Sequence, residues 1–197
     1  MSPTVIPFRS AAALDPAVLD PTHEAHDAAV EGSVAGTVER TVDADMALVA
    51  TNIGRFGMHL VHVGEGCSCG DCTTAPLPPD QRFGYTVGLT GLGHPELLVR
   101  GLGARETAVL LDRWGDTVLG GHVFDAGHLL CEGPGGTTWE LVPAHHPSET
   151  LRWAARYYRG TASGALGTGL SALELIPARR PCPCDWCGRG RVATGPS

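Results

Sequence analysis

Six of the seven cysteines in this chain of 197 residues fall into two short segments that share one pattern. The first segment reads CSCGDC over residues 67–72, and the second reads CPCDWC over residues 182–187. Both have the spacing C-x-C-x-x-C, and most of the chain separates them. A C-x-x-C step places two thiolates where they can bind one tetrahedral metal ion. The two segments therefore predict a metal site that the fold assembles from distant parts of the chain.

We expect this site to hold one structural zinc ion per chain. The six candidate ligands are Cys67, Cys69, Cys72, Cys182, Cys184 and Cys187. The two C-x-x-C steps supply four thiolates, which close a tetrahedral shell and leave no open coordination position. Cys67 and Cys182 would then be free or joined to each other as a disulfide. Two zinc ions with bridging thiolates, an iron–sulfur cluster and copper(I) are the competing metal assignments.

Three disulfides are the alternative that needs no metal, and they require an oxidising compartment. The first thirteen residues lack the basic start, the apolar segment and the small-residue cleavage site of a signal peptide. We therefore expect a cytoplasmic protein with reduced thiols, which favours metal over disulfides. The seventh cysteine, Cys131, is expected to be a small buried apolar residue.

Composition excludes several classes of function. The net charge of −7 argues against a general nucleic-acid binder, because that affinity depends on neutralising phosphates. No apolar run approaches the length that a membrane span needs. All 14 basic residues are arginine, so Schiff-base chemistry and a P-loop lysine are both excluded. The sequence leaves the oligomeric state open, with a homodimer among the options.

The pattern of apolar residues predicts a single α+β domain over residues 42–190. Residues 1–41 are rich in proline and acidic side chains and read as a poorly ordered or loosely attached arm, and residues 191–197 as a flexible tail. Between them we expect helices from Asp43 to Phe56, over 106–119 and, capped by Ser148, over 149–159. Strands are expected over 58–63, 82–90, 96–102, 123–131, 137–142 and 171–176. This irregular order indicates a mixed or antiparallel sheet with a few packed helices and a metal-stapled C-terminal tail.

The strand expected over 82–90 alternates large and small residues. Phe83, Tyr85 and Val87 share one face, while the opposite face carries Gly84, Thr86 and Gly88. Small side chains on a whole strand face indicate that another backbone or a ligand lies close against it.

Several of these segments resemble a family of bacterial proteins catalogued as domain of unknown function 4262. The resemblance rests on GMHLVHV at 57–63, FGYTVGL at 83–89, GHPEL at 93–97, WAARYY at 153–158 and ALELIP at 172–177, and it covers about residues 46–188. No activity comes with the resemblance, so it implies no catalytic residue. Relative to the family pattern, the turn after the first strand and the C-terminal tail each carry an added cysteine triad, which suggests that the two places are neighbours in the fold.

The candidate binding pocket lies at the turn that begins with His94 and Pro95. We expect Tyr85, Thr86, His94 and Glu96 to line it, with His94, Glu96 and Tyr85 as candidate catalytic residues. A histidine and a carboxylate two positions apart can act as a general acid–base pair or as metal ligands. The competing interpretation is that both side chains hydrogen-bond to the turn and fix the entry into the strand.

Two functions of different classes follow. The first is a zinc-binding bacterial protein that handles a small molecule, as an enzyme or a binding protein of a specialised pathway. The second is a non-catalytic interaction module whose zinc knuckle contacts a partner. A third, weaker hypothesis is a zinc-dependent deaminase-like hydrolase, since His94-x-Glu96 and Pro183-Cys184-x-x-Cys187 imitate that signature. The hypothesis leaves the first cysteine segment unexplained.

Overall fold

The computed structural model describes residues 5–6, 34–66, 75–133, 135–160 and 169–179. Both cysteine segments and the tail over 191–197 lie outside the described residues. In chain order the elements are β1 (Val5–Ile6), α2 (Val34–Phe56), β2 (His59–Val63), the 3-10 helix η2 (Pro79–Gln81), β3 (Phe83–Val87), the 3-10 helix η3 (Leu89–Leu92), β4 (Glu96–Arg100), α3 (Ala104–Leu119), β5 (Leu129–Cys131), β6 (Thr138–Pro143), α4 (Pro147–Thr150), α5 (Arg152–Gly160) and β7 (Ala172–Pro177).

The strands form one mixed sheet in the order β1-β5-β6-β7-β4-β3-β2. β4 pairs with β7 in parallel, and so does β1 with β5. The other neighbours are antiparallel: β2 with β3, β3 with β4, β5 with β6 and β6 with β7. Because strands far apart in sequence are neighbours, the chain folds as one α+β unit, which confirms the expected class.

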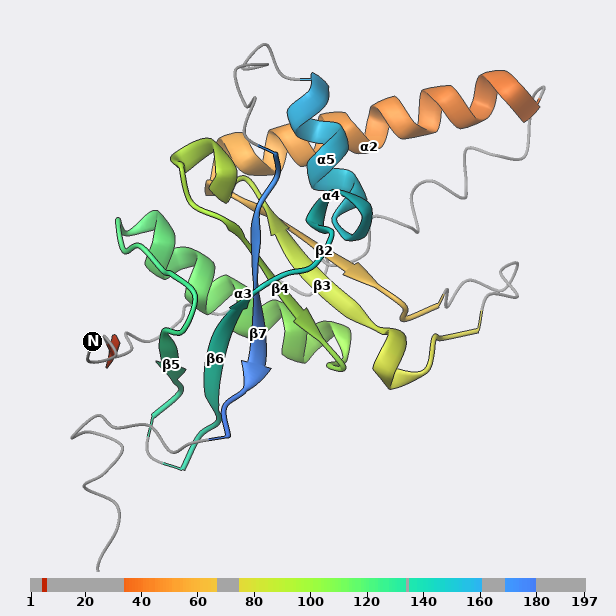
Figure 1. Ribbon diagram of the computed structural model, residues 1–197. Helices are drawn as coiled ribbons and strands as arrows, with labels where there is room; N and C mark the ends of the chain where they lie inside the picture. The colour runs from red at the N-terminus through yellow and green to blue at the C-terminus, as the bar shows by residue number, and fades with distance from the viewer. Residues whose placement is uncertain (1–4, 7–33, 67–74, 134, 161–168, 180–197) are drawn as a thin grey trace, which may run out of the picture.

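Helices cover both faces of this sheet (Figure 1). On one face α3 packs through Leu111 and Trp114 against the apolar side chains of the central strands. On the other face α2 and α5 contribute Val49 and Ala154 to a second apolar cluster. The second cluster matters for function, because it fixes α5 above β3 and β4.

The small face of β3 is filled by protein. A Cβ atom on Gly84 would stand 2.3 Å from Cγ2 of Thr107 in α3 and 3.0 Å from the backbone oxygen of Val61. At Gly88, φ is +133°, and a Cβ atom there would stand 2.8 Å from the backbone oxygen of Gly57. The close neighbour that the sequence indicated is therefore another backbone and a helix.

Two helix ends differ from expectation. α2 begins at Val34, upstream of Asp43, although it ends where Gly57 takes a left-handed conformation, as expected. The predicted cap at Ser148 is wrong, because Ser148 lies inside the short helix α4, which begins after His146. The helix is interrupted at Leu151, whose side chain is buried, and α5 begins at the next residue. Burying Leu151 outweighs the continuous helix that propensity alone favours.

Two predicted strands are shorter than their apolar patterns. The strand expected over 82–90 ends at Val87, because Gly88 turns the chain into η3. The strand expected over 123–131 begins only at Leu129, and Phe124 packs into the core from a loop. Among the described residues, no helix combines the length and the apolar character that crossing a membrane requires.

Candidate functional site

Glu96, the first residue of β4, is a fully buried carboxylate surrounded by donors. Its Oε2 accepts a hydrogen bond from the Thr86 hydroxyl at 2.7 Å. Its Oε1 accepts bonds from the backbone N–H of Gly88 at 3.1 Å and of Thr90 at 2.9 Å, and from the Thr90 hydroxyl at 2.9 Å. The Tyr158 hydroxyl makes the shortest bond to Oε1, at 2.6 Å. Such charge-assisted bonds explain how a carboxylate can be buried here although no basic side chain pairs with it among the described residues.

Two tyrosine hydroxyls bind α5 to the sheet, one near each end of the helix. Near its start, the backbone N–H of Trp153 donates to the Tyr85 hydroxyl at 3.2 Å. This N–H belongs to the first turn of α5, where amides have no partner within the helix. Near its end, Tyr158 donates to Glu96 and accepts from the Gly88 N–H at 2.8 Å. The face of α5 is therefore fixed relative to β3 and η3.

His94 supports the structure through both of its ring nitrogens. Nε2 accepts a hydrogen bond from the backbone N–H of Phe124 at 3.0 Å, and Nδ1 donates to the Pro95 carbonyl at 2.6 Å. The ring also contacts Phe124 edge-on, at a centroid distance of 5.7 Å. Burial lowers the pKa of His94, although the Pro95 carbonyl and the negative charges of Glu96 and Asp125 offset part of this effect. A neutral imidazole with both nitrogens bonded is poorly suited to bind a metal ion.

The structure brings the four predicted pocket residues together, but it places all of them below the surface. Tyr85, Thr86, His94 and Glu96 are each at most 4% exposed. His94 and Glu96 hydrogen-bond to the backbone of the turn between β3 and β4, as the competing interpretation describes, whereas the Tyr85 hydroxyl bonds to α5. None of the four is among the residues that line the two cavities described next.

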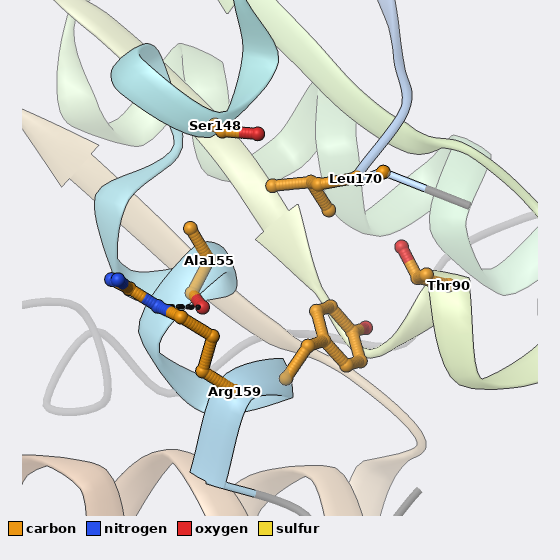
Figure 2. A pocket seen from close by; sticks show the side chains of 7 residues that line it. Thr90, Ser148, Ala155, Arg159 and Leu170 are labelled. Carbon is orange, nitrogen blue, oxygen red and sulfur yellow. Dashed lines mark hydrogen bonds between the residues drawn. The ribbon is translucent and has the colours of Figure 1, made fainter. Parts of the chain in front are cut away.

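A cavity of about 500 Å³ opens beside this network, between η3, α4, α5 and the segment that leads into β7. We call it the Tyr158 cavity. Its lining residues are Thr90, Ser148, Ala155, Tyr158, Arg159, Gly169 and Leu170. Figure 2 shows the Thr90 and Ser148 hydroxyls and the Leu170 side chain directed into the space beside α5. The walls thus combine hydroxyl groups, two apolar side chains and one guanidinium group.

A second cavity, of about 480 Å³, adjoins the first along α5. We call it the arginine cavity. Its lining residues are Ser148, Glu149, Arg152, Arg156 and Arg159. Ser148 and Arg159 line both cavities, so the two spaces are neighbours.

The tyrosine hydroxyls of the network stay protonated over the physiological pH range. Burial, the adjacent Glu96 charge and the bond to that charge raise the pKa of Tyr158 far above its usual value. Burial raises the pKa of Tyr85 to about 12, and the Trp153 N–H offsets only part of that effect. Neither hydroxyl is therefore a base at neutral pH, and Tyr158 offers a ligand a polar but uncharged wall.

Within the described residues, no three or more histidine, cysteine, aspartate or glutamate side chains gather as a metal site. The predicted cysteine ligands lie outside that part of the chain. Cys131 is buried at the end of β5, as expected, and it is disulfide-bonded. From the sequence Cys131 was expected to be a small buried apolar residue, and its disulfide was not predicted.

Three residues of this site escaped the sequence analysis. Tyr158 was predicted only to lie in the helix over 149–159, Thr90 at the end of the strand over 82–90, and Arg159 at the end of that helix. The available signal was the buried carboxylate itself, because a glutamate in an apolar strand needs several donors close by. This requirement indicates that the partners are hydrogen-bond donors, but it does not indicate their positions in the sequence.

Replacing Tyr158 by phenylalanine should destabilise the fold by about 1.5–3 kcal/mol, since it removes a bond to a buried charge. Unfolding in urea, followed by tryptophan fluorescence, measures the change. Tyr157→Phe is the matched control, because the Tyr157 hydroxyl has no hydrogen bond within the described residues and the ring stays in place. Equal stabilities for the two variants would contradict the role of the Tyr158 hydroxyl.

His59 should make the fold sensitive to mild acid. It is 4% exposed, its Nδ1 accepts from the Asn52 amide at 2.9 Å, and its Nε2 has no partner in the described structure. Burial lowers the pKa of His59 to about 4 from 6.5. The unfolded chain therefore takes up this proton first, and stability present above pH 6.5 is lost as the pH falls toward 4.

The loss assigned to His59 is on the order of 3 kcal/mol between these pH values. Urea unfolding at several pH values measures it. His59→Gln, which does not titrate, should flatten the dependence over this range even if it lowers stability at neutral pH. An unchanged slope in the variant would show that other groups cause the acid sensitivity.

The chain matches the model of the family described as a domain of unknown function, number 4262, over residues 52–170. No curated protein and no solved structure is significantly similar to it. The matched region contains Glu96, its donors and both tyrosines that bind α5. Since the match spans more than half of the chain, this protein belongs to the domain of unknown function 4262 family.

Proposed function

We propose that this chain is a small-molecule binding protein whose ligand occupies the Tyr158 cavity. The observation that carries the proposal is the composition of the cavity walls. Ala155 and Leu170 provide apolar surface, and Thr90, Ser148 and Tyr158 provide hydroxyl groups. A volume of about 500 Å³ lies within the range of ligand sites, and a few polar groups in an apolar surround are typical of them.

The support beneath the cavity favours binding over a merely structural gap. Thr90 and Tyr158 line the cavity and both bond to Glu96, so two of its polar walls are held in place by a buried charge. A wall fixed before the ligand arrives reduces the entropy that binding must overcome. Glu96 itself is saturated with donors, so we assign it a positioning role and not that of a general base.

The competing function is a non-catalytic interaction module whose zinc knuckle contacts a partner. The polar cavity beside the Glu96 network favours the small-molecule proposal over this one. We keep the interaction module as the function to consider if the cavity proves unable to bind ligands.

Ala155→Leu should abolish ligand binding by filling the Tyr158 cavity. Leucine is compatible with the helix, so α5 should be retained. Saturation-transfer NMR with a set of uncharged fragments measures binding, and we expect the affinities to fall at least tenfold. Ala50→Leu is the matched control, because Ala50 is an exposed helical alanine of α2 that lines neither cavity. Fragments that bind wild type and Ala155→Leu equally would contradict the proposal.

We also propose that the two cysteine segments hold one structural zinc ion. The sheet topology supports this, because β2 and β7 run in the same direction. Their C-terminal ends therefore lie at the same end of the sheet, with β3 and β4 between them. Three strand spacings amount to roughly 14 Å, which a few extended residues can bridge. Two observations favour the disulfide alternative instead. Cys131 is disulfide-bonded. The Ala178 N–H donates to the Thr138 carbonyl at 2.8 Å, which keeps the chain after β7 beside β6.

The metal content of the purified protein separates these assignments. Inductively coupled plasma mass spectrometry should find about one zinc ion per chain, and chelation should lower the melting temperature, since metal binding stabilises the fold. Cys184→Ser should lower both the zinc content and the melting temperature. A ratio near two, iron in place of zinc, or fully oxidised cysteines without metal would each contradict the single-zinc proposal.

A further inference from the structure

Helix α5 presents three arginines along one face. Arg152, Arg156 and Arg159 follow one another at spacings of four and three residues, which places them on the same side of the helix. All three are exposed, and all three line the arginine cavity. The chain carries a net charge of −7, so a cavity lined by three guanidinium groups is a positively charged site on a negatively charged protein.

These charges are only partly compensated by acidic neighbours. Within the described residues, Arg152 and Arg159 form no ion pair: their Nε atoms donate to the carbonyls of Glu149 at 3.4 Å and Ala155 at 3.0 Å. Each guanidinium group also has two Nη nitrogens. Arg156 lies near Asp45 of α2, whose pKa is raised by burial and lowered in part by that arginine.

The one carboxylate in the lining of the arginine cavity belongs to Glu149. Its side chain is 82% exposed and lies 3.9 Å from Nδ1 of His146, on the turn that begins α4. Arg152 and Arg159 form no ion pair among the described residues, so this single carboxylate leaves an excess of positive charge in the lining. The arginine cavity therefore remains positive and suits an anion.

We propose that the arginine cavity binds the phosphate group of a phosphorylated small molecule whose remaining part occupies the Tyr158 cavity. This inference rests on the proposed function and extends it to a class of ligand. The shared walls, Ser148 and Arg159, allow one molecule to occupy both spaces. Guanidinium groups form paired hydrogen bonds with phosphate and with carboxylate. The guanidinium groups of Arg152 and Arg159 together match the several oxygens and the double charge of a phosphate better than the two oxygens of a carboxylate.

Isothermal titration calorimetry with pyrophosphate, inorganic phosphate and acetate tests this proposal on the full chain. We expect pyrophosphate and phosphate to bind and to be displaced by raised salt, and acetate to bind at least tenfold more weakly. The double variant Arg152→Gln/Arg159→Gln should lose at least tenfold in pyrophosphate affinity. Arg105→Gln is the matched control, because Arg105 is an exposed arginine of α3 that lines neither cavity.

Pyrophosphate affinity that is equal in the double variant and in Arg105→Gln would overturn the assignment, and so would an absence of phosphate binding to wild type. Acetate binding as tight as phosphate would replace the phosphate by a carboxylate and would also overturn it. Ala155→Leu separates this inference from the proposed function. That variant should lose the uncharged fragments and keep pyrophosphate, since Ala155 lines only the Tyr158 cavity. Fragments that never bind, with pyrophosphate binding retained, would contradict the Tyr158 cavity alone.

Discussion

The buried charge of Glu96 is the constraint on which the site depends. A carboxylate taken out of water costs several kcal/mol unless donors replace the lost hydration. In this fold the donors come from the end of β3, from the adjoining η3, and from α5, which is distant from both along the chain. Each of these segments must stand at its observed place for the charge to be tolerated. The network therefore specifies the geometry at the end of β3 more strictly than apolar packing alone would.

The position of α5 follows from this constraint and determines what the surface can bind. Tyr85 accepts an amide from the first turn of α5, and Tyr158 reaches Glu96 from its last turn. With the inner face of the helix held in this way, its arginines must face outward over the arginine cavity. The Tyr158 cavity lies between the held helix and η3. The buried network thus holds the inner face of α5, and the two cavities lie along the same helix.

Hydrophobic periodicity was enough to predict most of the fold, because alternation and helical spacing report directly which face is buried. It failed where a single residue overrides the local pattern, as Leu151 does when it breaks the helix that Ser148 was expected to cap. The site was predicted only in part. His94 and Glu96 were selected as a histidine and a carboxylate two positions apart, but the role of Glu96 depends on donors such as Tyr158. The position of such donors relative to Glu96 in the folded protein cannot be read from the sequence.

Amide hydrogen exchange at Gly88 and Thr90 tests the central role of Glu96 most directly, because both N–H groups donate to its Oε1. Measured by NMR in wild type and in Glu96→Gln, exchange at these two amides should be slow in wild type. It should become at least tenfold faster in the variant, since a neutral amide is a weaker acceptor than a carboxylate. Rapid exchange at both amides in wild type, or equal protection in the two proteins, would contradict the account.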